Sequence, residues 1–524
     1  MRQIATGQAQ GSRGEYSVTI FEDRIAFEAV DIFHRFPQDL FSRGCGARGD
    51  LGQLAPRKKL LKSTSSFPEL SETLLALFGT EGFFIFLRAA LFRLPRHTAA
   101  RKRWLMSECY QLRCRECGKL WGNTPKSFCE ECFSPLEVAF DYDALKKIAR
   151  KENLASRNFN MWRYSEFLPL PEGFSAPNSV GGTPLVAARH LAKKWGLQNL
   201  YVKNDAVCYP SLSFKDRVVA TALAAARRFE FKTVGCSSTG NLANAVAAQS
   251  AQQGFDACVF IPADLEPAKI LNTAVYGARI VRINGNYDHV NRLCAQIADR
   301  FQWGLVNVNL RPYYAEGSKT HGFEIAEQLG WTLPDNVVVP MAGGSLITKI
   351  AKAFRELVLL GWVKEKPVKF FGAQATGCSP ISDGVKRNLA RFEPQKPQTI
   401  ARSLAIGNPA DGPYAMKEIR GSGGWADDVS DPEIVEAIQL LAETEGIFGE
   451  TAAGVTVGVT QKLVEDGRIG PNETTVVCVT GNGLKTTDAI AAEYPATEAI
   501  APRLEAFEAY LDAQLATSAV AAKV

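Results

Sequence analysis

The chain has 524 residues, of which 46% are hydrophobic and 22% are charged. Its length exceeds that of one domain, and its composition excludes a disordered or fibrous protein. The formal net charge of +5 arises in residues 1–105, which carry 16 Lys and Arg against 10 Asp and Glu. The rest of the chain is close to neutral, which argues against an extended nucleic-acid-binding surface there.

Residues 1–105 show no sustained hydrophobic period, and we expect a poorly organised N-terminal extension. Either translation naturally starts at Met106, or the extension is a basic arm particular to this protein. The longest apolar stretch, residues 74–94, is interrupted by charges such as Glu81 and Arg88, so no membrane-spanning helix is expected. The first thirty residues lack the apolar core of a signal peptide, and we expect a cytoplasmic protein.

Four of the twelve cysteines form two close pairs, Cys114 with Cys117 and Cys129 with Cys132, joined by an eleven-residue loop. This spacing lets four thiolates bind one tetrahedral zinc ion. Because the protein then fills every ligand position, the metal is expected to be structural. Most other cysteines sit in apolar runs, which indicates reduced thiols and a cytosol-like compartment. We assign residues 106–140 to a zinc-ribbon-like segment.

Apolar, β-branched runs alternate with helical stretches through most of the remaining chain. This alternation is typical of parallel sheets covered on both faces, and the number of runs indicates two α/β domains with a cleft between them. We place this region at 141–510, with a smaller α/β subdomain at about 220–315 inserted in the larger one, and a C-terminal tail at 511–524. The expected strands are 200–202, 233–236, 257–261, 279–283, 305–308, 337–341, 370–373 and 475–479.

The segment Ser-Leu-Ser-Phe-Lys-Asp-Arg, which ends at Arg217, precedes an Ala-rich run without Gly or Pro. Ser213 and Asp216 have the spacing of a capping box, so a helix is expected to begin at Phe214. Lys215 then falls in the first turn, where the unpaired N–H groups and the helix dipole disfavour a second positive charge. Many lysines simply point into water. In this chain, however, there are three turns, further along the sequence, whose residues suit the binding of an aromatic phosphate.

Each of these three turns closes an apolar run. Residues 237–241, Ser-Ser-Thr-Gly-Asn, offer hydroxyl and N–H groups to a carboxylate, although an ordinary helix cap fits equally well. Residues 342–346, Ala-Gly-Gly-Ser-Leu, let N–H groups close on a phosphate at a helix N-terminus, and the pattern matches neither a Walker loop nor a dinucleotide fingerprint. Residues 480–485, Thr-Gly-Asn-Gly-Leu-Lys, offer a neutral hydroxyl to a ring nitrogen.

Together with residues 309–320, Asn-Leu-Arg-Pro-Tyr-Tyr-Ala-Glu-Gly-Ser-Lys-Thr, these motifs resemble threonine synthases, which are fold-type II pyridoxal phosphate enzymes. The resemblance covers about residues 109–490, including the zinc-ribbon-like start that some members carry. It implies an α/β fold with two doubly wound parallel-sheet domains of the tryptophan synthase β type, preceded by a small zinc ribbon. It also implies pyridoxal 5'-phosphate as cofactor and a homodimer as a compatible assembly.

The implied activity is that of a lyase in threonine biosynthesis. Its small-molecule substrate is O-phosphohomoserine, which reacts with water to give threonine and phosphate. Neither nucleic acid nor a membrane is expected as a partner. Within the cofactor site, Asn241 is expected at the ring hydroxyl and Thr480 at the ring nitrogen.

The resemblance gives individual residues their roles. Lys215 is expected to carry the cofactor and to act as general base. The implied cofactor-binding residues are Lys215, Asn241, Gly343, Gly344, Ser345, Leu346 and Thr480. The implied substrate-binding residues are Ser238, Thr239 and Asn241 beside the carboxylate, and Asn307, Arg311, Ser318 and Lys319 beside the phosphate. The metal ligands are Cys114, Cys117, Cys129 and Cys132.

Two alternatives stay open at this point. Another fold-type II enzyme, such as a threonine or serine dehydratase or a cysteate synthase, shares the single motifs but needs no second anion pocket, which Arg311 and Lys319 would provide. A zinc ribbon and a basic arm would also suit a nucleic-acid-binding protein with an inactive α/β body. We further expect His321 to be a hydrogen-bonded structural residue and Glu450 to be a helix cap. The turn cluster 407–412 either borders the pocket or is an ordinary loop.

Overall fold

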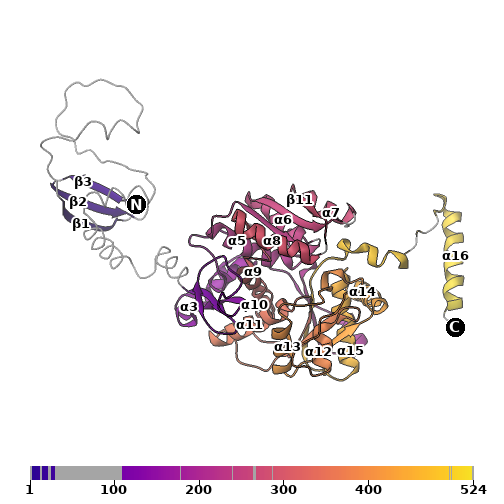
Figure 1. The fold of residues 1–524 in the computed structure, drawn as a ribbon. Coiled ribbons are helices and arrows are strands. Elements are labelled where there is room, and N and C mark those ends of the chain that lie inside the picture. The colour runs from indigo at the N-terminus through magenta and orange to yellow at the C-terminus, as the bar shows by residue number, and fades with distance from the viewer. Residues whose placement is uncertain are drawn as a thin grey trace. The chain divides into compact units, whose positions relative to one another are not determined.

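The computed structural model describes residues 3–11, 14–21, 25–29, 109–177, 179–238, 240–263, 267–285, 287–494, 496 and 499–521. The apolar stretch 74–94 lies outside these residues. The chain divides into two compact units, residues 1–102 and residues 103–524. In the first, β1 (Gln3–Gly11), β2 (Gly14–Phe21) and β3 (Ile25–Ala29) form an antiparallel sheet in that order (Figure 1). The described part of the N-terminal extension is therefore a regular sheet.

The second unit opens with a small antiparallel sheet of order β5-β4-β6, made of β4 (Tyr110–Cys114), β5 (Leu120–Gly122) and β6 (Leu136–Phe140). Burial alternates along β4 and β6, as it does in a sheet with one face covered. The buried Leu112 and Val138 belong to the same hydrophobic cluster as the α/β region. The cysteine-bearing segment is thus packed against the body of the protein.

Two parallel sheets form the α/β region. The smaller has the order β11-β10-β9-β12, and the larger has the order β15-β14-β13-β16-β8-β7, in which only β7 runs antiparallel to its neighbour. The strands are β7 (Leu185–Ala187), β8 (Asn199–Asn204), β9 (Thr233–Ser237), β10 (Asp256–Pro262), β11 (Arg279–Ile283), β12 (Gly304–Leu305), β13 (Asn336–Pro340), β14 (Lys369–Ala375), β15 (Ala426–Val429) and β16 (Thr474–Val479).

Seven of the eight expected strands are present close to their expected bounds, and the one expected at 305–308 is reduced to the two residues of β12. The two-sheet α/β fold is confirmed. The four strands of the smaller sheet lie between residues 233 and 305, inside the segment proposed for the smaller subdomain. The edge strands β7 and β15 were not expected. Each has only three or four residues: β15 includes Asp427 and Asp428 and so has no apolar run, and the apolar run of β7 is only three residues long.

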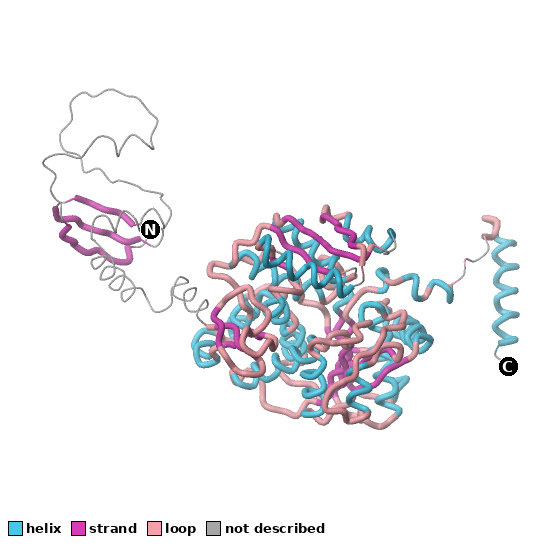
Figure 2. The backbone as a smooth tube through the Cα atoms, in the orientation of Figure 1, coloured by secondary structure: helices cyan, strands magenta, loops and turns pink. Residues whose placement is uncertain are grey.

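The helices of the described residues include those that lie on both faces of the parallel sheets (Figure 2). They are α3 (Tyr142–Ile148), α4 (Arg189–Trp195), α5 (Lys215–Arg228), α6 (Asn241–Gln253), α7 (Pro267–Ala274), α8 (Tyr287–Phe301), α9 (Arg311–Glu316), α10 (Lys319–Gln328), α11 (Ser345–Leu359), α12 (Pro380–Lys386), α13 (Gly412–Gly421), α14 (Asp431–Glu445), α15 (Thr451–Glu465) and α16 (Leu504–Ala521). Short 3₁₀ turns include η3 (Met161–Phe167) and η4 (Asp205–Val207). Helix α16 crosses the boundary proposed at residue 510. None of the described helices has the length and hydropathy needed to span a bilayer.

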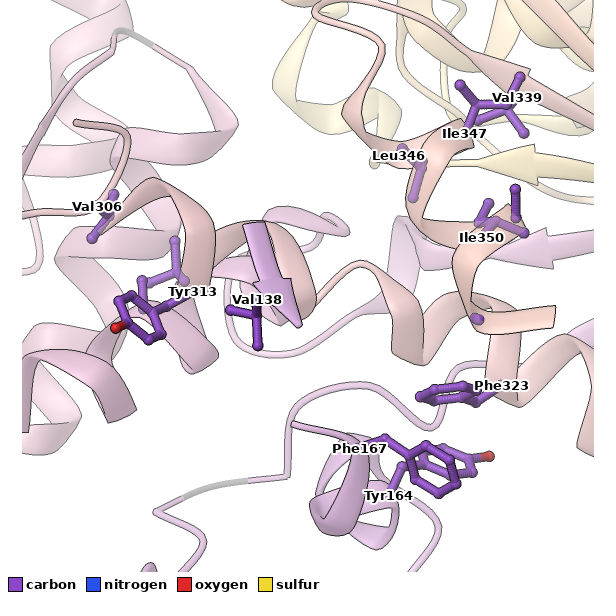
Figure 3. Close-up of a cluster of buried hydrophobic side chains, with 14 of the residues drawn as sticks. Val138, Tyr164, Phe167, Val306, Tyr313, Phe323, Val339, Leu346, Ile347 and Ile350 are labelled. Carbon is purple, nitrogen blue, oxygen red and sulfur yellow. The ribbon is translucent and has the colours of Figure 1, made fainter. Parts of the chain in front are cut away.

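One hydrophobic cluster joins the parts of this unit. Val138 of β6, Tyr313 of α9 and Val339 of β13 all belong to it (Figure 3). Within it, the ring of Phe323 in α10 lies 5.2 Å from that of Tyr164 and 4.9 Å from that of Phe167, centre to centre. Burying a large apolar side chain contributes about 1.5–3 kcal/mol. The zinc-ribbon-like sheet and both parallel sheets therefore share one core.

A fully buried cluster of charges fixes the first turn of α5. The guanidinium of Arg217 donates to Asp205 at 2.7 and 2.9 Å and to Glu324 at 2.6 and 2.8 Å. Lys203 donates to Glu324 at 2.7 Å. All four side chains are inaccessible to solvent. Two cationic side chains pair with two carboxylates. Such pairing is needed if charges are to be buried without a large cost in desolvation free energy.

His321 joins this cluster as a structural residue, as expected. Its Nδ1 lies 3.2 Å from Asp205 Oδ2. Burial lowers the pKa of His321, although the charge of Asp205 opposes this shift. A neutral imidazole leaves the two-cation, two-carboxylate balance of the cluster intact.

The predicted capping box of α5 is wrong. The helix begins at Lys215 with Phe214 as its cap residue, and no side chain caps it. Asp216 instead accepts hydrogen bonds from the backbone N–H and the hydroxyl of Ser211, both at 2.9 Å. The Asp216 carboxylate is buried and must therefore be hydrogen-bonded. Because it accepts from Ser211 in the preceding turn, it does not form the hydrogen bond to the cap residue that a capping box requires.

We predict that Glu324→Gln lowers the free energy of unfolding by about 3–5 kcal/mol, because it leaves Arg217 and Lys203 with too little negative charge in a buried site. Denaturant titration of the purified protein measures this loss. The matched control is Glu418→Gln, whose carboxylate pairs with the exposed Arg355 at 2.7 Å and should change stability by less than about 1 kcal/mol. Equal effects of the two substitutions would contradict the proposed role of the buried cluster.

The same comparison has a predicted pH dependence. Burial alone would raise the pKa of Glu324, but the charges of Arg217 and Lys203 lower it to about 2, from an ordinary 4.5. The stabilisation is therefore complete above the unfolded-state pKa and is lost as the pH falls towards 2. The stability difference between wild type and Glu324→Gln should be constant near neutral pH and should narrow below about pH 4.5.

Candidate active site

Lys215 is the first residue of α5, and its amine meets a tyrosine of a distant helix. Its Nζ lies 3.2 Å from the hydroxyl of Tyr314 in α9, and it lies 4.6 Å from the ring centre of Phe214. The residues on either side are held in place, because the Phe214 N–H donates to the Thr480 carbonyl at 2.9 Å and Arg217 is fixed in the buried cluster. A half-buried amine is thus carried on a rigid backbone.

A second group of polar side chains lies at the end of β16. Asn241, the first residue of α6, donates to the Glu450 carboxylate at 2.8 Å and accepts from Lys485 at 2.9 Å. The Thr480 hydroxyl also forms a hydrogen bond with Glu450. The positive charge of Lys215 interacts favourably with the same carboxylate. The structure therefore brings three of the predicted cofactor residues, Lys215, Asn241 and Thr480, to one place.

Glu450 is the centre of this group. It occupies the cap position of α15, as expected, but its side chain makes no capping hydrogen bond. Burial raises the pKa of Glu450, against hydrogen bonds from Asn241 and the charges of Lys485 and Lys215. Gly481 permits this approach, because a Cβ there would lie 2.4 Å from the Glu450 carboxyl carbon.

The glycine turn between β13 and α11 has the form of a phosphate cradle. Gly344 has a φ of +86°, and no atom lies within 4 Å of the position that a Cβ on Gly343 would occupy. Ser345 and the buried Leu346 begin the fifteen-residue helix α11, whose first N–H groups and dipole favour an anion. This turn offers open space and donors to a phosphate group.

An unsatisfied hydroxyl beside the 480–485 turn also fits a bound cofactor. Ser213 is paired with Gly481 through an isolated β-bridge. Its Oγ is buried and has no hydrogen-bond partner among the described residues. Buried polar atoms are normally satisfied, so this hydroxyl and the open glycine turn both fit a polar ligand. The residues present therefore fit pyridoxal phosphate.

The residues predicted beside the substrate carboxylate are only partly described. Ser238 is half-buried at the end of β9, and its Oγ accepts from the Gly240 N–H at 3.4 Å. Thr239 lies outside the described residues. Asn307, predicted beside the substrate phosphate, donates instead to the hydroxyl of Ser237 at 2.9 Å.

The two cations predicted for the substrate phosphate are placed differently. Arg311 begins α9, has a side chain 30% exposed, and pairs with Asp411 at 2.8 Å. Lys319 is fully buried, and its amine pairs with Glu356 and Glu316, each at 2.9 Å. Ser318 is 2% exposed at the start of α10. Arg311 is therefore accessible to solvent, whereas the amine of Lys319 is buried and already paired with two carboxylates.

The four predicted metal ligands come together. The sulfur atoms of Cys114, Cys117, Cys129 and Cys132 all lie within 4.8 Å of one another, in the only such group of three or more candidate ligands within the described residues. Hydrogen bonding to Ser134 lowers the pKa of Cys132 to about 6, which favours the thiolate that binds metal. The donor set and its compactness fit a tetrahedral zinc ion.

Sequence reasoning missed four residues of the site: Tyr314, Glu450, Lys485 and Asp411. Tyr314 lies inside a motif that was recognised, three residues after Arg311 and so on the same helix face. Lys485 closes the recognised 480–485 turn, and Asp411 lies in the turn cluster 407–412, which does border the site. A signal existed for each of these in its neighbouring motif. For Glu450 the sequence contained no such signal, because a glutamate at the start of a helix is normally explained by its favourable interaction with the helix dipole.

Comparison with known proteins agrees with this geometry. Residues 177–481 match the family described as pyridoxal-phosphate dependent enzyme. A threonine synthase of Methanocaldococcus jannaschii is 38% identical over 380 residues, which cover 72% of this chain and 93% of the relative. A threonine synthase of Mycobacterium tuberculosis is 34% identical over 341 residues, which cover 64% of this chain and 91% of the relative.

Solved structures show the same fold. Maize serine racemase has a TM-score of 0.51 at 20% identity, with 60% of this chain and 91% of that chain covered. A processed threonine deaminase from Solanum lycopersicum has a TM-score of 0.50 at 21% identity, with 59% of this chain and 83% of that chain covered. At such identities the likeness concerns the fold alone. The sequence relatives decide the family: this chain is a pyridoxal-phosphate dependent enzyme of the threonine synthase family.

Proposed function

We propose that this protein converts O-phospho-L-homoserine and water to L-threonine and phosphate. The observation that carries the proposal is the placement of the Lys215 amine beside Tyr314, between the 480–485 turn and the residues around Asn241. The threonine synthases that it resembles are covered over more than nine tenths of their length. A dehydratase shares the fold but not this level of sequence identity.

Pyridoxal phosphate, when bound, supplies an electron sink for the carbanion that proton removal creates. Lys215 would hold it, the turn 343–346 would bind its phosphate, Asn241 would lie at its ring hydroxyl and Thr480 at its ring nitrogen. The Nζ of Lys215, freed by the substrate, is the base that takes the Cα proton. The Tyr314 hydroxyl, 3.2 Å away, orients that amine.

The remaining residues handle the two anionic ends of the substrate. Ser238, Thr239 and Asn241 would bind the carboxylate through hydroxyl, amide and backbone N–H groups. Arg311 would bind the phosphate and stabilise its departure from Cγ, because an accessible guanidinium can donate two parallel hydrogen bonds to a phosphate. Lys319 is left out of this proposal because its amine is bound to two carboxylates.

The function is tested by the product. The purified holoenzyme should release inorganic phosphate and threonine from O-phosphohomoserine, and it should release ammonia from threonine far more slowly. Release of ammonia from threonine, with no phosphate from O-phosphohomoserine, would establish a dehydratase instead. Lys215→Ala should abolish the cofactor absorbance that borohydride traps in the wild type and should lower kcat at least about a thousandfold. The exposed Lys232→Ala is the matched control and should retain both.

We propose a structural zinc ion bound by Cys114, Cys117, Cys129 and Cys132. The purified protein should contain about one zinc per chain by elemental analysis. Cys117→Ser should lower both the zinc content and the unfolding temperature, because the metal stabilises only the folded segment. The control Cys258→Ser changes a buried thiol of β10 and should retain zinc. A wild-type protein that is stable and free of zinc would contradict the assignment.

We also propose a cytoplasmic location and a homodimer. The first is supported by the six described cysteines outside the zinc-ribbon-like segment, which are all buried free thiols. The second follows from the assembly of many fold-type II enzymes. Light scattering of the full chain would distinguish a dimer from a monomer.

A further inference from the structure

Asp411 lies between two arginines that come from distant parts of the chain. Its Oδ1 accepts from Arg115 at 3.0 Å and its Oδ2 accepts from Arg311 at 2.8 Å. Asp411 occupies the cap position of α13, yet its side chain makes no capping hydrogen bond. An aspartate at this position normally binds the helix N–H groups. Here the carboxylate is committed to the two guanidinium groups.

Arg115 is held firmly in this position. It lies within the first cysteine pair, between Cys114 and Cys117, and its backbone N–H donates to the Pro135 carbonyl at 3.1 Å. Its guanidinium carbon lies 3.3 Å from the ring centre of Tyr414, three residues after Asp411. The Tyr414 hydroxyl in turn donates to Glu116 at 2.7 Å. The zinc-ribbon-like segment therefore presents Arg115 to Asp411 as a fixed charge.

The carboxylate of Asp411 is also close to the site. The Asp411 N–H donates to the Gly343 carbonyl at 3.0 Å, so Asp411 is attached to the glycine turn proposed for the cofactor phosphate. Its other partner, Arg311, lies one helical turn before Tyr314, which contacts Lys215. The three charged groups thus lie along the edge of the site where the substrate phosphate is proposed to bind.

The charge balance of this trio decides how well an anion can bind. Asp411 and Arg311 alone would sum to zero, and the carboxylate would repel an incoming phosphate dianion. With Arg115 included, the trio keeps one net positive charge at a partly buried position, where a charge acts more strongly than in water. The nearby carboxylate of Glu116, which accepts from the Tyr414 hydroxyl, is exposed, so water and salt screen its charge more strongly. Arg311 makes a single side-chain hydrogen bond among the described residues, which leaves most of its five donors for a phosphate.

We propose that Arg115 is a positioning residue that determines specificity for the phosphate-bearing substrate. By sharing Asp411, it offsets the negative charge that would otherwise neutralise Arg311, and it fixes the carboxylate so that Arg311 faces the site. This inference rests on the proposed function, because it concerns the same anion pocket. It gives the zinc-ribbon-like segment a direct part in substrate recognition in addition to stability.

The test uses the full-length holoenzyme and inorganic phosphate as the probe. Phosphate binding is followed through the cofactor absorbance and through competitive inhibition against O-phosphohomoserine. Arg115→Gln should weaken phosphate binding and raise KM by about tenfold each, with a smaller fall in kcat, because the anion loses a favourable charge before it reacts. Its cofactor absorbance should match that of wild type, which shows that the site has formed.

Asp411→Asn gives the opposite expectation and separates electrostatics from damage to the fold. It removes the competing negative charge, so phosphate should bind at least as tightly as to wild type, and the double variant with Arg115→Gln, whose net charge equals that of wild type, should bind phosphate within about twofold of wild type. Arg113→Gln is the matched control. Arg113 lies two residues before Arg115, on β4, and its exposed guanidinium pairs with Glu137 at 2.7 Å instead of with Asp411.

The inference is overturned if Arg115→Gln changes phosphate binding no more than Arg113→Gln does. It is also overturned if Asp411→Asn weakens phosphate binding as much as Arg115→Gln does, because both would then act through the fold. Wild-type holoenzyme that binds no phosphate would overturn this inference together with the proposed anion pocket. Phosphate binding that is insensitive to Arg115 would overturn this inference alone and leave the proposed function in place.

Discussion

The arrangement of the α/β region depends on one buried charge cluster. Arg217 binds Asp205 at the end of β8 and Glu324 in the middle of α10, and all three side chains are shielded from water. Unpaired charge in such a place would be strongly destabilising, so the three elements can only meet in the orientation that satisfies every donor and acceptor. Because Lys215 is two residues before Arg217, the same constraint sets the position of the amine that we propose to be reactive.

Buried carboxylates perform this joining role at several other places. Glu450 joins the start of α6 to the turn after β16 by accepting hydrogen bonds from Asn241 and Thr480. Asp411 joins the zinc-ribbon-like segment to α9. In each case one carboxylate accepts hydrogen bonds from two or more segments that are far apart in sequence. The site is thereby fixed by charge-assisted hydrogen bonds in addition to apolar packing. These hydrogen bonds are directional, whereas apolar packing is not.

The site consequently has two kinds of surroundings. The amine of Lys215 is half-buried among neutral groups, Tyr314 and Phe214, with the negative charge of Glu450 farther away. The edge that includes Arg311 carries two guanidinium groups, those of Arg115 and Arg311, against the one carboxylate of Asp411. A neutral setting suits a group that exchanges a proton, and a cationic edge suits a leaving anion. The two steps of the proposed reaction are thus placed in different electrostatic environments of one site.

The sequence by itself determined what depends on neighbouring residues. Seven of the eight apolar runs became strands close to their expected bounds, and the spacing of the two cysteine pairs gathered four sulfur atoms. Lys215 falls in the first turn of α5 as expected, because the helix start follows from local composition. Glycine turns after strands predicted where ligand-binding backbone would lie, since parallel strands present their carboxyl ends at one edge.

Only the tertiary structure decided which charged side chain meets which. Arg217 was recognised as part of a motif, yet its partner Glu324 is 107 residues away. Glu450 looked like a helix cap and binds Asn241 across 209 residues, while Asp411 meets Arg115 across 296. Lys319 looked like a ligand for phosphate but is buried against Glu316 and Glu356. The physical reason is that periodicity and propensity act over a few turns of chain, whereas the pairing of charges is fixed by packing that brings distant elements together.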